Sequence, residues 1–317
     1  MICIVTLACS CNEVKTNQET QTPDNTPIPT EANQVYYQAI SLLGDTLYAA
    51  APNDALMEKY LTKQKTYLAN KKSLEDLIWY GRFMAYTGDY KGAIDLYSEG
   101  LKKWPSESRL LRHRGHRYIS LREFDKAVAD LSRAAQLIEG QENQLEEDGM
   151  PNTQNIPVST RHGNIYYHLG LAHYLKGDME QAKQAYIKAL LSSENQDNLV
   201  STTHWLYMIF SRMGEAKKAE TILLPISKEL IIIENQSYLN ACLFYKEMLT
   251  LDEVYKPNDA ANPSNSAIKY AIGNWYYYNG ELDKATEIFR GILEGDDWSS
   301  FGYIAAETDL ATMQEVL

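Results

Sequence analysis

The 317-residue sequence predicts an all-α protein built from repeated helical hairpins. Three observations lead to this prediction. Beyond residue 35, apolar residues recur every three or four positions, which is the spacing of one helical face, and runs of β-branched residues are few. Glycine or asparagine interrupts this pattern roughly every 13–20 residues, as at the ends of short helices. Small residues also recur at a nearly constant interval, since Ala93 and Ala127 are 34 residues apart and Ala182 and Ala219 are 37 apart.

Composition and charge narrow the classes of function. The chain is 44% hydrophobic with 17 glycines and 10 prolines, which excludes collagen-like and wholly disordered chains. Its 42 acidic residues against 30 lysines and arginines give a formal net charge of −12. General nucleic-acid binding needs a clustered cationic surface. We therefore expect no nucleic-acid partner.

The first 33 residues are predicted to be a processing signal and a tether. Residues 1–11 form a short apolar run that ends in small residues and cysteines, and residues 12–33 are polar and rich in Thr, Asn, Gln and Pro. This arrangement resembles a bacterial lipoprotein signal peptide, although no Lys or Arg precedes the apolar run. The resemblance implies a lipid on Cys11, with Cys9 as the competing position and an ordinary secretory signal as the alternative. It also implies a lipid-anchored protein of the bacterial cell envelope, either periplasmic or at the cell surface.

The later segments are expected to be helical in turn, so that residues 34–317 form one solenoid. Residues 34–70 are predicted to form a capping pair of helices, because VYYQAISLLGDTLYAA and ALMEKYLTKQKTYLA both carry apolar residues at helical spacing. Repeats follow over about residues 74–295 and include a poorer helix at 236–250. A closing helix is expected at 298–316.

The repeated blocks share small residues at corresponding positions. The block that begins at Leu74 has Gly81 where two helices would meet closely and Gly88 at the turn between them. In the next block Arg122 replaces the turn glycine. Equivalent small residues in the later blocks are Gly115, Ala127, Gly170, Gly177, Ala182, Gly214, Ala219, Gly273, Gly280 and Ala285. With the 34-residue interval, these blocks resemble the tetratricopeptide repeat (TPR). The resemblance implies a right-handed α-α superhelix with a continuous core and a concave groove.

In TPR proteins the first helix of each repeat lines the groove, at positions that share one helical face. The resemblance places there Arg82, Arg109, Arg112, His116, Asn164, Tyr167, Tyr174, His204, Arg212, Tyr270, Asn274 and Tyr277. Arginine forks bind carboxylates, so the four arginines are candidate anion anchors. We expect a protein or peptide partner with acidic character. The alternative is that these residues pair with neighbouring helices.

An insertion at residues 139–162 separates two helices that an ordinary repeat joins by a short turn. Its first half is acidic, and its second half contains turn-forming residues such as Pro151 and Pro157. A long loop in a compact helical array is either a functional lid or a tolerated insertion. An alternative function is therefore a small-ligand or glycan receptor, in which this loop closes over Tyr167, Tyr174 and His204.

The sequence lacks the common catalytic motifs that would indicate an enzyme. The sequence contains no HExxH, GxSxG, GxGxxG or phosphate-binding glycine loop. His113 and His116 are one helical turn apart, but the arginines around them would repel a metal dication. We expect no cofactor and no metal, and we interpret the chain as a non-enzymatic interaction scaffold.

Overall fold

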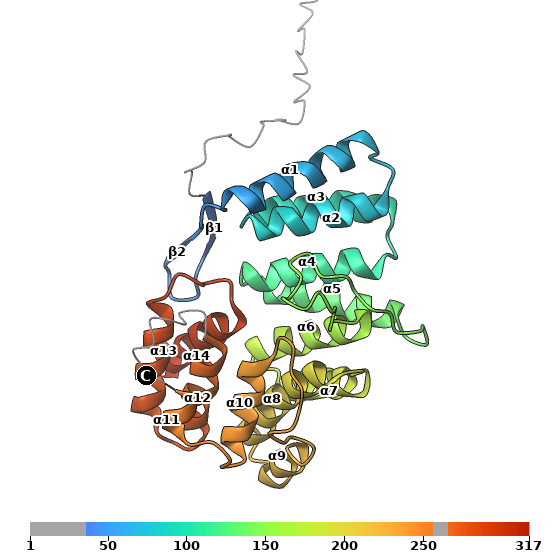
Figure 1. Ribbon diagram of the computed structural model, residues 1–317. Coiled ribbons are helices and arrows are strands. Elements are labelled where there is room, and N and C mark those ends of the chain that lie inside the picture. The colour runs from blue at the N-terminus through green and yellow to red at the C-terminus, as the bar shows by residue number, and fades with distance from the viewer. Residues whose placement is uncertain (1–35, 256–265, 317) are drawn as a thin grey trace, which may run out of the picture. The chain divides into compact units, whose positions relative to one another are not determined.

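The computed structural model describes residues 36–255 and 266–316, and it confirms the predicted helical architecture. Within these residues the chain forms fourteen helices and one two-stranded hairpin (Figure 1). In chain order, the elements are β1 (Tyr36–Ile40), β2 (Thr46–Ala49), α1 (Asp54–Ala69), α2 (Leu74–Tyr86), α3 (Tyr90–Lys103), α4 (Ser108–Ser120), α5 (Phe124–Leu137), α6 (Arg161–Leu175), α7 (Met179–Leu191), α8 (Gln196–Arg212), α9 (Ala216–Ile222), α10 (Gln236–Tyr245), α11 (Leu251–Val254), α12 (Ser266–Tyr278), α13 (Leu282–Leu293) and α14 (Phe301–Val316).

Successive helices pack as hairpins that are stacked in chain order (Figure 1). In the stack, the hairpins are α2 with α3, α4 with α5, α6 with α7, and α8 with α9, and each one contacts the next; α12 and α13 form a further hairpin. Helix α1 covers α2 at the start of the stack. We call the side formed by α2, α4, α6 and α8 the groove face, because these are the first helices of the predicted repeats.

Glycines allow the two helices of a hairpin to approach closely. A Cβ atom at Gly81 of α2 would lie 2.4 Å from the ring of Tyr97 on α3. The same atom at Gly170 of α6 would lie 2.5 Å from the ring of Tyr186 on α7. No real side chain tolerates such distances, so the small residues in the repeated blocks are those that close helix packing requires.

Residues 36–49 form a β-hairpin, so the prediction of a helix at the start of the 34–70 capping pair is wrong there. Alternate residues of β2 are buried, Leu47 and Ala49, whereas a register shift in β1 leaves the adjacent Gln38 and Ala39 both buried. Gly44 makes the turn with a φ of 94°. The Oε1 atom of Gln38 accepts a hydrogen bond of 3.0 Å from the backbone N–H of Tyr90, at the start of α3. The two strands of the hairpin therefore pair with each other, and Gln38 supplies the acceptor for a backbone N–H at the start of α3. Helix α1 lies where the second capping helix is predicted.

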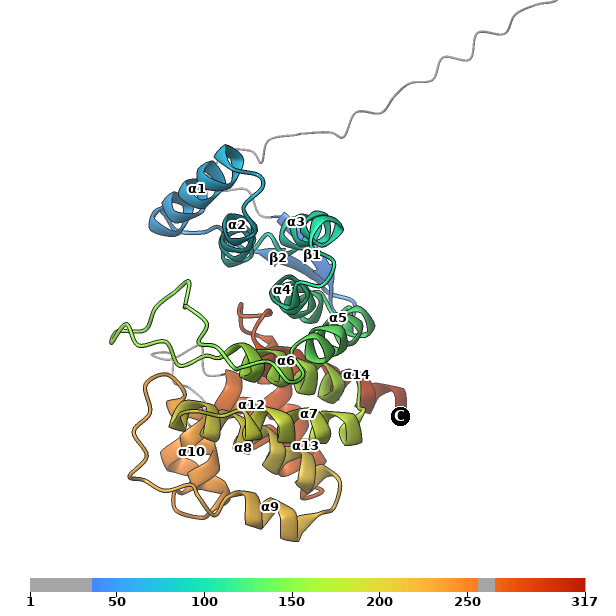
Figure 2. The ribbon, with the colours of Figure 1, turned by 90° about the vertical axis from the view of Figure 1, so that its right-hand side faces the viewer.

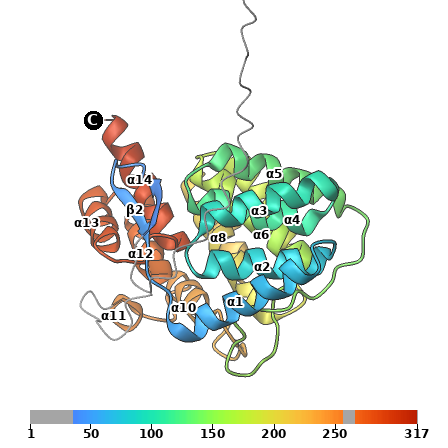
Figure 3. The same cartoon turned by 90° about the horizontal axis from the view of Figure 1, so that it is seen from above.

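The C-terminal helices fold back onto the groove face. Helices α10 and α12 contact α8, and α14 contacts α6, α12 and α13 (Figure 2). The hairpin β1–β2 lies beside α14 (Figure 3), where Glu307 accepts a 2.7 Å hydrogen bond from the backbone N–H of Leu42. Glu307 also forms a buried ion pair of 2.5 Å with Arg122, which follows α4. The first and last described elements are thus bonded to each other and to the middle of the stack.

The predicted signal peptide, the polar tether and the two candidate lipidation sites, Cys9 and Cys11, lie outside the described residues. Among the helices that are described, none combines the length and the hydrophobicity needed to cross a bilayer. Nor do any three His, Cys, Asp or Glu side chains of residues 36–255 and 266–316 gather as a metal ion would require.

Candidate binding surface on the groove face

The C-terminal helices cover part of the predicted groove. The hydroxyl oxygens of Tyr174 and Tyr270 lie 2.6 Å apart, and Asn274 is fully buried beside them. Arg212 donates from Nε to Oδ1 of Asn274 over 2.6 Å and from Nη1 to Oδ1 of Asp309 on α14 over 2.8 Å. These four predicted groove residues, Arg212 included, have internal partners. The prediction that they line an open groove, with Arg212 as an anion anchor, is therefore wrong.

His204 also lies in the interior and is 1% exposed. Its ring stacks on Tyr245 at a centroid distance of 5.9 Å and packs against Tyr238 at 4.9 Å. Burial lowers the pKa of His204 to about 3, so the ring is neutral at physiological pH. Its predicted place on the groove surface is wrong as well, because α10 covers it. Tyr277 stays partly exposed, with its ring 4.5 Å from the guanidinium of Arg212.

Three arginines, Arg82 of α2 and Arg112 and Arg117 of α4, lie close together on the groove face; we call them the arginine cluster. Arg112 is buried, and Arg82 and Arg117 are partly exposed. All three guanidinium groups lie near His113. Burial lowers the pKa of His113 most, and the three positive charges lower it further. Arg117 did not emerge from the repeat positions, although it belongs to the arginine-rich stretch of α4. The cluster therefore brings together two predicted residues and one that sequence reasoning missed.

Two members of the cluster lie against aromatic rings. The guanidinium of Arg82 is 4.4 Å from the ring centre of Trp79, and that of Arg117 is 5.1 Å from the ring centre of Tyr90. Within residues 36–255 and 266–316, neither arginine has a carboxylate partner. Aromatic faces attract cations but do not neutralise them. Neither guanidinium is therefore offset by direct contact with an acidic group of the described residues, and burial lowers the pKa of Arg117.

Arg112, the third member, is paired with Glu146 of the insertion. Arg112 Nη2 donates to Glu146 Oε1, and Asn164 Nδ2 of α6 donates to Glu146 Oε2 over 2.6 Å. The Nε2 atom of His113 lies 3.5 Å from Oε1. Burial alone would raise the pKa of Glu146, but the charge and hydrogen bonds of Arg112 and the bond from Asn164 lower it to about 2. An ionised carboxylate is thus held between two neighbouring repeats.

The base of the insertion fixes the backbone on either side of Glu146. Leu145 and Thr160 form an antiparallel bridge, and the backbone N–H of Glu146 donates to the carbonyl of Ser159 over 3.0 Å. The N–H of Arg161 donates to the carbonyl of Gln144 over 2.8 Å. Beyond this short ladder, the loop extends out from between α5 and α6 (Figure 2). The insertion therefore places the carboxylate of Glu146 on the groove face, and Gly149 packs nearby against Tyr86 of α2.

Arg109 lies at the rim of the same region and is already paired. Its Nη1 atom is 2.7 Å from Glu75 of α2, and its Nε atom is 3.0 Å from Glu107. This matches the alternative that predicted groove residues pair with neighbouring helices. A cavity of about 190 Å³ separates Arg109 from Arg82 and is also lined by Arg161.

A second cavity, of about 220 Å³, lies between α6 and α8, and we call it the α6–α8 cavity. Two predicted residues, Asn164 and Tyr167, line it, as do Asn198, Tyr238 and the end of the insertion, which includes Thr160. The buried Oδ1 atom of Asn198 has no hydrogen-bond partner among the described residues. Because Asn164 also binds Glu146, this cavity adjoins the arginine cluster.

The remaining predicted residue, His116, packs against two residues that line the α6–α8 cavity, His168 and Phe301. Its ring lies 4.3 Å from that of His168 and 5.3 Å from Phe301 at the start of α14. Burial is the main cause that lowers the pKa of His116 well below its usual value, and it lowers that of His168 to about 3. Tyr174 and His204 do not line the α6–α8 cavity. The predicted closure of the loop over those two residues therefore does not fit this geometry.

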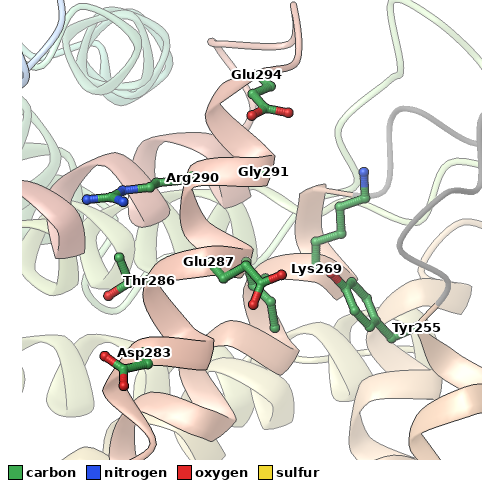
Figure 4. Close-up of a pocket in the computed structure, with 9 residues that line it drawn as sticks. Tyr255, Lys269, Asp283, Thr286, Glu287, Arg290, Gly291 and Glu294 are labelled. Atoms are coloured by element: carbon green, nitrogen blue, oxygen red, sulfur yellow. The ribbon is translucent and has the colours of Figure 1, made fainter.

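Another cavity, of about 530 Å³, lies along α13 and is lined by none of the predicted residues. Figure 4 shows its side chains: Arg290 and Lys269 point in different directions, and the acidic groups follow one another along the helix. The labelled groups do not converge on a point, so this cavity supplies no candidate site.

Comparison with known proteins identifies the repeat. Residues 163–196, which contain α6 and α7, match the family model of the tetratricopeptide repeat. The chain is 29% identical over 138 residues to the bovine (Bos taurus) BBSome complex member BBS4, covering 44% of this chain and 22% of that protein. It is 29% identical over 120 residues to the small glutamine-rich tetratricopeptide repeat-containing protein 2 of Saccharomyces cerevisiae, covering 38% and 29%. The chain thus spans less than a third of the length of these curated relatives.

Two solved structures resemble the chain at low sequence identity. A tetratricopeptide repeat protein from Parabacteroides merdae is 15% identical, with 80% of this chain and 92% of that chain covered and a TM-score of 0.46. YrrB, described as a TPR protein with an unusual peptide-binding site, is 15% identical, with 80% and 98% covered and a TM-score of 0.40.

Proposed function

We propose that this chain, in which residues 163–196 match the tetratricopeptide repeat, binds an acidic segment of a protein partner at the arginine cluster. Proteins built from this repeat generally act as scaffolds for protein or peptide partners. The observation that carries this proposal is the imbalance of charge. Of the three arginines, Arg112 alone has a carboxylate partner within the described part of the chain. The neighbouring histidines are neutral, so they neither add to this charge nor offset it.

The chemistry of the cluster favours a carboxylate over other groups. A guanidinium presents paired donors that match the two oxygens of a carboxylate. A partly buried cation without a counter-ion is costly, and an incoming acidic side chain would relieve that cost. Trp79 lies under Arg82 and would hold its guanidinium flat for such a contact. The overall charge of −12 makes this region a local exception on the molecule.

Fluorescence anisotropy with a labelled peptide tests the proposal. The probe is NQLEEDG, an acidic sequence taken from residues 143–149 of this chain, and its matched control is NQLQQNG. We expect the acidic peptide to bind and the neutral peptide not to bind. Arg82→Gln should weaken binding at least about tenfold, because a hydrogen bond to a charged group contributes roughly 1.5–3 kcal/mol.

The control variant is Arg133→Gln, which removes the same charge from an exposed position on α5, where the side chain donates to the carbonyl of Pro105. Its affinity for NQLEEDG should stay close to that of the wild type. Equal weakening by Arg82→Gln and Arg133→Gln, or equal binding of the two peptides, would contradict the proposal. Arg112 is unsuitable for this test, because its removal leaves Glu146 buried without a partner.

We also propose that the chain is anchored to a bacterial envelope membrane by a lipid on Cys11. The apolar residues 1–11 and the polar residues 12–33 support this proposal. The wild type, expressed in a bacterium that processes lipoproteins, should enter the detergent phase of a Triton X-114 extraction. Cys11→Ser should move it to the aqueous phase while Cys9→Ser has no effect. The reverse result would place the lipid on Cys9, and aqueous partition of the wild type would refute anchoring.

A further inference from the structure

We propose that Glu146 is an internal competitor for the partner's carboxylate, so that the insertion restrains binding at the arginine cluster. This inference rests on the proposed function and adds its regulation. The donors to Glu146 come from the groove face, Arg112 on α4 and Asn164 on α6, whereas the acceptor comes from outside the repeats. The insertion therefore supplies the acidic group in the way that a separate acidic ligand would.

The side chain of Glu146 is held by polar contacts with the groove face. Each carboxylate oxygen has a donor, from Arg112 on one side and from Asn164 on the other. Its chain neighbours do not add an apolar contact, since Leu145 is 65% exposed and Glu147 is exposed. The carboxylate is thus the acidic group that binds the groove face, while the backbone ladder at the base and the contact of Gly149 with Tyr86 hold the backbone of the insertion. A carboxylate of a partner could replace it by forming the same bonds.

The charges around Glu146 leave room for an acidic competitor. Glu146 neutralises Arg112, but Arg82 and Arg117 remain without a carboxylate partner in residues 36–255 and 266–316. A partner with two acidic groups could first contact Arg82 and then displace Glu146 from Arg112. The apparent affinity for the partner is the intrinsic affinity multiplied by the fraction of molecules in which Glu146 does not occupy Arg112. An attached competitor is effective because its local concentration is high.

Two matched variants separate competition from net charge. Glu146→Gln and Glu147→Gln each remove one negative charge from adjacent positions, and glutamine keeps the shape of the side chain. We expect Glu146→Gln to bind labelled NQLEEDG at least about tenfold more tightly than the wild type, if the internal carboxylate occupies the position in roughly nine molecules out of ten. The side chain of Glu147 is exposed, so the affinity of Glu147→Gln for NQLEEDG should stay within about twofold of the wild-type value, as expected for a surface charge.

A second measurement needs no substitution. Hydrogen–deuterium exchange of the wild-type chain, with and without saturating NQLEEDG, should show faster exchange at residues 143–149 in the presence of the peptide, while α4 stays protected. This readout remains informative if Glu146→Gln reduces stability.

The outcomes distinguish the two proposals. If Glu146→Gln binds NQLEEDG no more tightly than Glu147→Gln, and exchange in the insertion is unchanged, the competition is refuted. The proposed function then still stands, provided that all the proteins prefer NQLEEDG to NQLQQNG. If no protein, Glu146→Gln included, prefers the acidic peptide, the proposed function itself fails.

Discussion

Histidines on the groove face are buried and neutral, and this makes the stability of the chain sensitive to acid. His204 isolates the effect, because burial is the cause that lowers its pKa to about 3. The groups packed against it from α10 are the rings of Tyr238 and Tyr245, and Trp205 packs against it from its own helix. The unfolded chain binds a proton at this residue near pH 6.5, whereas the folded chain does not until about pH 3. Stability therefore falls as the pH drops below 6.5.

We predict that His204→Phe flattens this dependence. Between pH 6 and pH 4, the free energy of unfolding should change by about 1.4 kcal/mol less per pH unit than in the wild type, because one titrating group is removed. Urea unfolding followed by circular dichroism at several pH values measures the slope. His204→Gln serves as the control for the ring: it should flatten the slope equally, even if it lowers stability at pH 7. An unchanged slope in both variants would contradict the burial of a neutral His204.

Periodicity along the sequence predicted a helical face correctly but not what covers it. Arg82 and Tyr167 each line a cavity, and Arg112 is paired with Glu146 of the insertion. Arg212 lies one place beyond the corresponding repeat position, and its partner Asp309 is 97 residues further along the chain. Nothing in the spacing of α8 indicates that α14 returns to it. Arg117 was missed for the opposite reason, since it lies outside the repeat positions although it points toward the same cluster.

Close packing between the two helices of a hairpin depends on glycine, and this is the property of the repeat that the sequence predicted best. We predict that Gly170→Ala in α6 destabilises the chain by about 1–3 kcal/mol, because the new methyl group would lie 2.5 Å from the ring of Tyr186. That ring is fully buried and has no room to move. The measurement is the free energy of unfolding in urea.

Gly291→Ala in α13 is the matched control. A Cβ atom there meets nothing within 4 Å, so the substitution should be neutral or stabilise the helix by up to about 1 kcal/mol. If both variants lost the same stability, helix propensity or a general effect of alanine would explain the loss, and close packing at Gly170 would not.

The hairpin β1–β2 was not predicted, and the reason is physical. Its sequence carries apolar residues at spacings that fit a helix as well as a strand, and a short apolar segment does not decide between the two. What favours the strand is tertiary contact: Trp298 donates from Nε1 to the carbonyl of Tyr48 over 2.7 Å, and Gln38 accepts from the start of α3. These partners are distant in sequence, so they are visible only in the folded chain.

At the scale of the whole described fold, the pair Arg122–Glu307 connects three elements that are far apart in sequence. Arg122 replaces the turn glycine of its repeat and adopts a φ of 63°, which is unfavourable for a side chain. Its guanidinium is buried against Glu307, and the same carboxylate accepts from the backbone N–H of Leu42. The strain at Arg122 is therefore offset by a contact that joins the stack, the hairpin and α14.

We predict that Glu307→Ala lowers the free energy of unfolding by about 3–5 kcal/mol, because it leaves the Arg122 charge buried without a counter-ion and removes the acceptor for Leu42. Glu281→Ala is the control: its pair with Lys284 is exposed, so the loss should not exceed about 1 kcal/mol. Arg122→Gly combined with Glu307→Met should recover part of the loss, since glycine accepts the positive φ and no charge stays buried, while the N–H of Leu42 still lacks its acceptor. Urea unfolding gives the magnitudes, and hydrogen exchange should rise in β1–β2 and α14 in the single variant. A loss in Glu307→Ala as small as in Glu281→Ala would mean that the contact between the two ends of the fold is not what stabilises it.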